Sequence, residues 1–141
     1  MKRIAAIALF AVASSFGVGH ALAQDLQLRA TMPFNFTVGD KALPAGSYTI
    51  LQVRDDLIEI RSQEGNAAVL SVAYLDSYQH VKNAVLVFNK YGDQYFLSTV
   101  AGGPGTANES LPISKTEARV RHQENLALNK SQVTIPLGEG N

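Results

Sequence analysis

The chain has 141 residues, of which 46% are hydrophobic and 17% charged; its 12 basic and 12 acidic residues balance, and cysteine is absent. This composition excludes a low-complexity disordered chain, because such chains combine few apolar residues with a high net charge. It also excludes disulfides and cysteine-based chemistry, so packing and hydrogen bonds must hold the fold together. The length favours a single domain.

The N-terminus has the form of an export signal. Met1-Lys2-Arg3 precedes an apolar run over residues 4–18, and Ala21-Leu22-Ala23 places small residues at the two positions that a signal peptidase inspects. The run is interrupted by Ser and Gly and falls short of the roughly 20 apolar residues of a membrane span. We predict a signal peptide over residues 1–23, cleavage before Gln24, and a periplasmic or extracellular mature protein.

Cleavage would change the charge of the protein. Removal of Lys2 and Arg3 leaves 10 basic residues against 12 acidic ones, so the mature chain carries a net charge of about −2. Such a chain does not present the basic surface that seeks phosphates, and we predict no nucleic-acid partner. No second apolar stretch approaches bilayer length, which predicts no membrane span in the mature chain.

The mature chain begins with a β-domain, predicted over residues 24–101. Apolar and polar residues alternate there with a period of two, and Gly, Pro, Asp or Asn interrupt the pattern about every eight to twelve residues, which is typical of consecutive antiparallel strands. The first alternating segments cover residues 26–32 and 34–38, and Pro33 separates them.

The turns in this pattern predict how the strands pair. If Asp55-Asp56 forms a two-residue turn, Leu51 lies opposite Ile60 and Val53 lies opposite Ile58. All four side chains then share one dry face. A slip of one residue would mix apolar and polar side chains, so the hydrophobic pattern predicts this register.

The next turn is predicted at Glu64-Gly65-Asn66. A three-residue turn there places Leu70 opposite Ile60 and Val72 opposite Ile58, which continues the dry face. Gly65 or Asn66 can supply the positive φ that such a turn requires.

A third hairpin is predicted over residues 84–91 and 94–100, around the turn Gly92-Asp93. Both of its faces are apolar. Because strands of this kind are usually covered on both sides, the hairpin should lie centrally, beneath the C-terminal segment, or at a subunit interface. One predicted face carries Leu86, Phe88, Tyr95 and Leu97, and the other carries Val85, Val87, Tyr91, Phe96 and Val100.

The C-terminal third has a different character. Residues 102–113 are rich in Gly and Pro, which predicts a loop. Ser114 and Glu117 have the spacing of a capping box and begin a helix predicted over residues 114–130. Its apolar positions form no clean stripe, so we expect weak docking. Residues 131–141 are predicted as a tail with a short extended piece that frays at its end.

The sequence supports no catalytic residue, cofactor site or metal site. A hydrolytic arrangement would use His80 as a base, Asp76 to orient it, and Ser71 or Ser77 as nucleophile. However, no G-x-S-x-G elbow is present, and the His, Asp and Glu residues lack the spacings of known metal sites. We predict a non-enzymatic protein without a cofactor.

Aromatic residues are the candidates for a binding surface. Tyrosine offers apolar area with a hydrogen-bonding tip, which suits a groove for sugar or peptide. Tyr78, His80, Tyr91 and Tyr95 are the residues we expect on such a surface.

Three segments together resemble a known group of proteins: MPFNFTVGDKALPAGSYTI (32–50), LVFNKYGDQYFLSTV (86–100) and ESLPISKTEARV (109–120). In order and spacing they are similar to small secreted proteins of unknown function that are abundant in acidobacterial genomes. The resemblance covers most of the mature chain. It implies a bacterial envelope or extracellular location and supplies no activity, cofactor or site residue.

We therefore predict one all-β domain, an antiparallel sandwich or partly closed barrel of about seven strands with a C-terminal helix. The favoured function is an envelope or extracellular binding module whose partner is an envelope protein, a polysaccharide or another copy. The alternatives are a barrel that carries a small apolar ligand and a small hydrolase that uses His80. The predicted core comprises Phe34, Phe36, Leu51, Val53, Ile58, Ile60, Leu70, Val72, Phe88 and Leu97.

Overall fold

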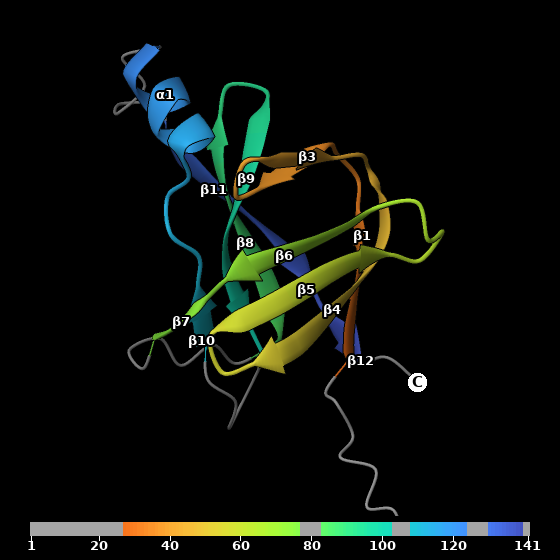
Figure 1. Cartoon of the computed structure of the whole chain (residues 1–141). Helices are drawn as coiled ribbons and strands as arrows, with labels where there is room; N and C mark the ends of the chain where they lie inside the picture. Colours follow the sequence, from red (N-terminus) through yellow and green to blue (C-terminus); the bar gives the residue numbers. More distant parts are fainter. Residues whose placement is uncertain (1–26, 77–82, 103–107, 124–129, 140–141) are drawn as a thin grey trace, which may run out of the picture.

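The computed structural model of the chain describes residues 27–76, 83–102, 108–123 and 130–139. These residues form 12 strands and one helix, and the strands make two facing sheets that do not close into a barrel (Figure 1). The prediction of an all-β sandwich with a C-terminal helix is confirmed. The predicted signal peptide lies outside the described residues.

The first sheet has the strand order β12-β1-β4-β5-β6, and all of its neighbours pair antiparallel. Alternation is clearest in β1, where Leu28, Ala30 and Met32 face the interior and are buried. The strands span β1 Gln27–Met32, β4 Gly46–Arg54, β5 Leu57–Ser62, β6 Ala68–Val72 and β12 Gly138–Glu139.

The second sheet has the order β11-β8-β9-β10-β7, and a short hairpin of β2 and β3 joins it through a parallel contact between β2 and β9. The described ranges hold 12 strands against the predicted number of about seven; seven of them have five or more residues, and the other five have two or three. The second-sheet strands span β2 Phe36–Val38, β3 Lys41–Leu43, β7 Tyr74–Asp76, β8 Val85–Tyr91, β9 Gln94–Ala101, β10 Asn108–Ser110 and β11 Ser131–Pro136.

Aromatic rings fill the space between the sheets. Phe88 is fully buried and lies edge-to-face against Phe34 and Phe36, with ring centroids 5.3 and 5.6 Å apart. Tyr48 packs against Phe36 from the first sheet, and its hydroxyl donates a 2.7 Å hydrogen bond to the carbonyl of Pro44. That bond satisfies the one polar atom of a side chain that is otherwise core.

The predicted register of the first hairpin is wrong by one residue, although its turn is correct. Arg54 pairs with Leu57 on either side of Asp55-Asp56, but a bulge at Val53 then places Gln52 opposite Ile58. A bulge exchanges the two faces of the strand for every residue beyond it, counted from the turn, which here means the residues that precede Val53 in the sequence. Tyr48 and Ile50 therefore enter the core, Leu51 lies on the half-buried outer face, and Val53 is 49% exposed.

The second turn shifts the register once more. It has four residues instead of three, because the Ser62 amide bonds the Ala67 carbonyl across the loop, and Gly65 has the expected positive φ of 74°. Val69 consequently lies opposite Ile60. Leu70 and Val72 point outward and are 61% and 42% exposed, so their assignment to the core was wrong.

The third hairpin turns at Gly92-Asp93 as predicted, with Tyr91 paired to Gln94. It is both central and covered. β8 and β9 lie inside the second sheet, and Tyr91 and Phe96 on the outer face pack with Val120 of helix α1. An irregularity after Val87 shifts the register, so that Val100 joins the main core instead of the outer face.

Helix α1 spans Lys115–Gln123; of the predicted helix 114–130, residues 124–129 lie outside the described residues, and residue 130 is not helical. Ser114 caps it, since its hydroxyl oxygen accepts a 3.1 Å hydrogen bond from the Glu117 amide. Glu117 does not complete the capping box; its carboxylate turns into the protein, against β8. Asp40, in the β2–β3 turn, adds a second cap by accepting bonds from the amide and the hydroxyl of Thr116.

The predicted boundaries after residue 101 need correction. Strand β10 lies within the predicted loop 102–113, where it pairs with β7 and β9. The predicted tail 131–141 contains β11, which pairs with β8, and β12, which pairs with β1. Residues 138–139 are thus held in a sheet, because the edge strand β1 offers them unpaired backbone groups.

Candidate functional site

The outer face of the first sheet carries an exposed apolar surface. Cross-strand pairing places Leu51, Glu59 and Leu70 in one row across β4, β5 and β6, and Leu57 and Val72 in the next row. Residues in the same row are neighbours on the same face. Leu51, Leu57, Leu70 and Val72 therefore form one cluster, which we call the outer patch.

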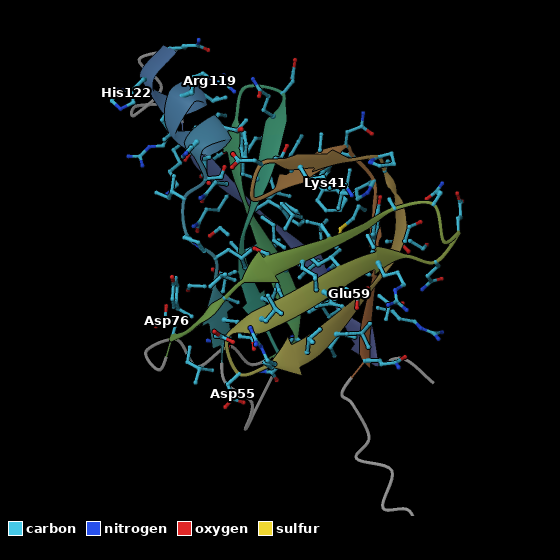
Figure 2. The ribbon with its side chains drawn as sticks, in the orientation of Figure 1. Lys41, Asp55, Glu59, Asp76, Arg119 and His122 are labelled. Atoms are coloured by element: carbon cyan, nitrogen blue, oxygen red, sulfur yellow. The ribbon has the colours of Figure 1, made fainter. Side chains whose placement is uncertain are left out.

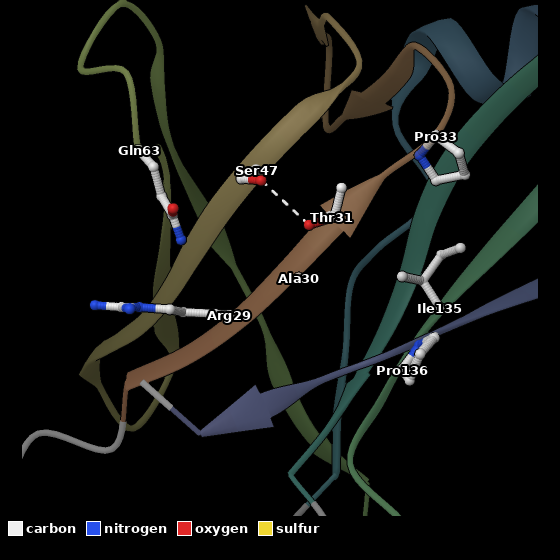
Figure 3. Close-up of a pocket in the computed structure, with 8 residues that line it drawn as sticks. All are labelled: Arg29, Ala30, Thr31, Pro33, Ser47, Gln63, Ile135 and Pro136. Carbon is white, nitrogen blue, oxygen red and sulfur yellow. Dashed lines mark hydrogen bonds between the residues drawn. The ribbon is translucent and has the colours of Figure 1, made fainter. Parts of the chain in front are cut away.

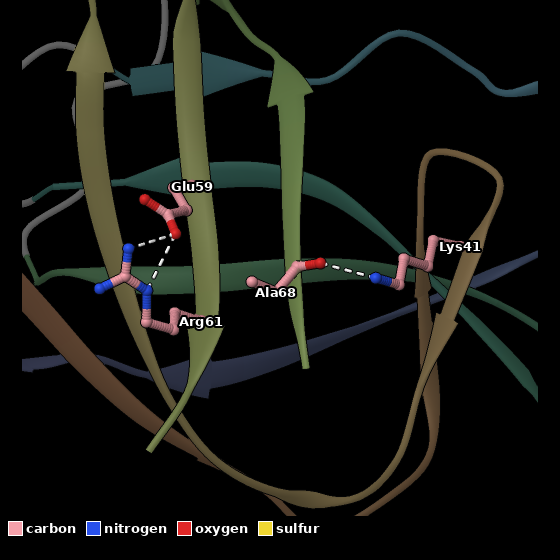
Figure 4. Close-up of polar contacts among 4 residues, drawn as sticks. All are labelled: Lys41, Glu59, Arg61 and Ala68. Atoms are coloured by element: carbon pink, nitrogen blue, oxygen red, sulfur yellow. Dashed lines mark hydrogen bonds and ion pairs between the residues drawn. The ribbon is translucent and has the colours of Figure 1, made fainter. Parts of the chain in front are cut away.

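The charge within the outer patch is neutralised by a neighbour. Arg61 donates from Nε and from Nη2 to Oε1 of Glu59, over 2.9 and 2.6 Å (Figure 4). The Glu59 side chain is only 18% exposed, whereas that of Arg61 is 56% exposed. Such a charge-assisted pair compensates the carboxylate without a partner from outside. The patch can thus be covered without burying an unpaired charge.

Strand β6 is also an edge of the first sheet, and edges expose backbone groups. The Nζ atom of Lys41, on β3, donates a 2.7 Å hydrogen bond to the Ala68 carbonyl at this edge (Figure 4). Lysine side chains at free sheet edges commonly hinder pairing with another strand, because that strand would have to displace them. The contact favours the face of β6, rather than its edge, as the surface available to a partner.

Charged residues flank the outer patch on two sides. Arg29 and Arg61 lie in one row, joined through Thr49, on the side toward the β5–β6 turn. Asp55 and Asp56 occupy the β4–β5 turn at the opposite end of the strands, where Asp55 is labelled in Figure 2. Asp56 lies 3.6 Å from Arg54. After the Arg61–Glu59 and Arg54–Asp56 pairs are counted, Arg29 leaves one positive charge on one side of the patch and Asp55 leaves one negative charge on the other.

A surface groove of about 580 Å³ lies between β1 and β11 (Figure 3). Within it, the hydroxyls of Thr31 and Ser47 lie 3.1 Å apart and bond each other. Its surface mixes guanidinium, hydroxyl and amide groups with aliphatic side chains, which gives it no single ligand chemistry. The groove is lined by Arg29, Ala30, Thr31, Pro33, Ser47, Gln63, Ile135 and Pro136.

A buried polar cluster lies beneath α1. Oε1 of Glu117 accepts 2.9 Å hydrogen bonds from Nδ2 of Asn89 and from the hydroxyl of Tyr91. Burial, together with the Glu117 carboxylate, raises the pKa of Tyr91 to about 12. All three side chains are at most 5% exposed. The cluster therefore fastens the helix to the sheet and does not present a reactive group to solvent.

A second buried carboxylate bridges the two sheets. Glu109 of β10 is 6% exposed, and its Oε1 accepts a 2.6 Å bond from Nε2 of Gln52 on β4. Burial raises the pKa of Glu109, while the bond from Gln52 partly opposes the rise. The bulge at Val53 is what brings Gln52 to the inner face. One carboxyl with an amide partner makes a tie between sheets, not a catalytic pair.

The predicted aromatic surface is not assembled by the described residues. Tyr78 and His80 lie outside them. Tyr91 is 1% exposed, so its prediction as a surface residue is wrong. Tyr95 is half-buried because its ring stacks on Phe34 with centroids 3.8 Å apart, and Nζ of Lys90 lies 5.5 Å from the same ring.

The hydrolytic alternative centred on His80 stays a prediction, since that residue is not described. Two of its other members are engaged elsewhere: the Ser71 hydroxyl donates to the Val72 carbonyl, and Asp76 accepts a bond from Ser110. Within the described ranges, no three His, Asp or Glu side chains come together as metal ligands.

The outer patch was not predicted as a surface, because Leu51, Leu70 and Val72 alternate with polar residues in the way that core residues of a strand do. The competing signal was available: Tyr48 and Ile50 share the other face of β4, and an aromatic ring with an isoleucine buries more area than Leu51 and Val53.

Comparison with protein-family models, curated proteins and solved structures found no match to the chain. Of the residues that the structure describes, none belongs to a helix long and apolar enough to cross a bilayer.

Proposed function

We propose that the protein is a secreted, non-enzymatic binding module of the bacterial envelope or extracellular space, and that the outer patch is its binding surface. The exposure of Leu70 and Val72, beside the half-buried Leu51 and Leu57, carries this proposal. Isolated surface leucines are common, but several apolar side chains grouped on one sheet face are typical of an interaction site. The compensated Glu59–Arg61 pair supports the same interpretation.

The carrier alternative has less support. A barrel carrier holds its ligand in an interior cavity. Here the sheets do not close, and Phe36, Tyr48 and Phe88 fill the space between them. The groove beside β11 lies outside this interior and has a mixed polar lining.

The test measures binding of the labelled mature chain, residues 24–141, to envelope fragments of the source bacterium. Leu70→Lys places a charge in the outer patch, opposite Glu59, where a cross-strand ion pair keeps the fold intact. The matched control is Ile113→Lys, which changes another exposed aliphatic residue (51% exposed) before α1. We expect Leu70→Lys alone to lose binding. Equal binding by both variants and the wild type would overturn the assignment of the patch.

A separate measurement tests export. Expression of the full chain in a Gram-negative host should deliver a periplasmic product whose N-terminal residue is Gln24. A product that keeps Met1 and stays in the cytosol would contradict the secreted location.

A further inference from the structure

We propose that the outer patch is a contact between two copies of this chain, packed face to face with their strands reversed. The inference rests on the proposed function, in that it takes the outer patch as the binding surface, and it names the partner. Three observations carry it: the apolar cluster, the internal neutralisation of Glu59, and the order of charges along the strands.

The order of charges is what selects a second copy. Along the outer face run, in sequence, the row of Arg29 and Arg61, the outer patch, and the Asp55-Asp56 turn. Glu59 neutralises Arg61 and Arg54 pairs with Asp56, so Arg29 gives one side of the patch a net charge of +1 and Asp55 gives the other side a net charge of −1. A two-fold axis that lies parallel to the sheet, across its strands and over the patch, reverses this order in the partner. Each basic row then faces the acidic turn of the other copy, twice by symmetry.

Apolar complementarity follows from the same operation. The axis lays the outer patch of one copy, with Glu59 between Leu51 and Leu70, against the same patch of the other, as expected for an isologous interface. Sheets pack face to face about 10 Å apart with their strands roughly aligned, and such packing accommodates leucine and valine side chains. Because Glu59 is already paired with Arg61, the contact buries no uncompensated charge.

The second sheet shows what such a cover achieves. On its outer face, Tyr91 and Phe96 are 1% and 2% exposed because α1 lies over them. No segment in the described part of the chain lies over the outer patch in this way, and Leu70 stays 61% exposed. A second copy supplies the missing layer.

The first experiment is sedimentation equilibrium of the mature chain over a concentration series. We expect a reversible monomer–dimer equilibrium in the wild type and in Ile113→Lys, and a dissociation constant raised by about tenfold or more in Leu70→Lys. A wild type that is monomeric up to millimolar concentration overturns the proposal. So does a dimer that Leu70→Lys leaves unchanged.

The second experiment tests the charge order and does not depend on the patch variant. Arg29→Glu leaves the Arg61–Glu59 pair in place and changes the remaining charge of the basic row from +1 to −1, whereas Asp55→Lys changes the charge of the turn from −1 to +1. Each variant alone should dimerise more weakly than the wild type. An equimolar mixture should form heterodimers, counted by native mass spectrometry, because one contact is then native and the other is reversed in sign on both sides. A statistical mixture or a purely monomeric sample would contradict the strand-reversed arrangement.

The two proposals fail differently. If the wild type is monomeric but Leu70→Lys abolishes envelope binding, the patch binds an envelope partner, and only the second-copy inference is wrong. If neither self-association nor envelope binding responds to Leu70→Lys, both are wrong.

Discussion

The hairpins β4–β5 and β8–β9 both carry apolar side chains on two faces, but their outer faces are covered to different extents. The outer face of β8–β9 is covered by α1, and Phe96 there is 2% exposed. On the outer face of β4–β5, continued by β6, Leu51 and Leu57 are half-buried and Leu70 is 61% exposed. A strand that is apolar on both sides needs two covers. The second sheet obtains its second cover from its own chain, whereas the described residues place no such cover over Leu70 and Val72 of the first sheet.

The largest expected effect separates the two outer faces directly. Phe96→Ala empties a site enclosed by Tyr91 and α1, and should lower the free energy of unfolding by about 3 to 5 kcal/mol. Leu70→Ala removes an exposed side chain and should change it by no more than about 0.5 kcal/mol. Urea denaturation of dilute protein measures both. Similar losses in the two variants would contradict the comparison.

The next effect tests how α1 is fastened. Glu117→Ala leaves the Asn89 amide and the Tyr91 hydroxyl without their buried acceptor, and should cost about 2 to 3 kcal/mol in unfolding free energy. Glu117→Gln keeps an acceptor oxygen and should cost less. If the alanine variant were as stable as the glutamine variant, these bonds would contribute nothing to the docking of the helix.

The same cluster has a pH signature. The pKa of Tyr91 is raised to about 12 in the folded protein, above its usual 10. The folded state therefore holds this proton more tightly, so the associated stability is complete below pH 10 and is lost as the pH rises from 10 to 12. Burial also raises the pKa of Tyr48, so ultraviolet titration should show Tyr48 and Tyr91 ionising late, and Glu117→Gln should shift the titration of Tyr91 alone toward the other tyrosines.

A smaller effect concerns the hydrogen bond between Gln52 and Glu109, which joins the two sheets. Burial raises the pKa of Glu109 above its usual 4.5, so the stability linked to its proton is present below pH 4.5 and is lost as the pH rises through the folded pKa. Glu109→Gln removes this dependence while Gln52 keeps an oxygen acceptor. We expect the variant to gain stability over the wild type at pH 7 and less or none at pH 4. Parallel stability curves for the two proteins would contradict a buried ionising group.

The smallest effect lies at the exposed start of α1. The bonds from the Thr116 amide and hydroxyl lower the pKa of Asp40, so its contribution is present above its usual 3.8 and disappears as the pH falls through the folded pKa. Asp40→Asn should slightly lower the melting temperature at pH 7 and leave it unchanged at pH 2. An equal change at both pH values would show that the charge is not involved.

The β-turns were predictable because short polar segments have few conformations open to them. Asp55-Asp56 and Gly92-Asp93 lie in turns as expected, and Gly65 has the positive φ required of it. Register was not predictable in the same way. The bulge at Val53 and one extra residue in the turn after Ser62 each shift the pairing by one position, and a one-residue shift exchanges the faces of a strand.

Because these shifts exchange the two faces of a strand, the sequence analysis assigned residues of the outer patch to the core. Leu70 and Val72 were assigned to the core, whereas Tyr91 was assigned to the surface and is buried under α1. Whether an apolar face is covered depends on a segment far away in the chain, such as residues 115–123 for β8 and β9. The local alternation of apolar and polar residues carries no information about which distant segment will cover a strand.

By itself, the sequence determined an antiparallel β-domain with these turns and a C-terminal helix, because strand and turn preferences act over a few neighbouring residues. The tertiary structure alone decided which apolar face of β4, β5 and β6 is buried and which is exposed. That choice is made by the contacts of Tyr48, Ile50 and Gln52 with the opposite sheet, and those contacts exist only once the two sheets have met.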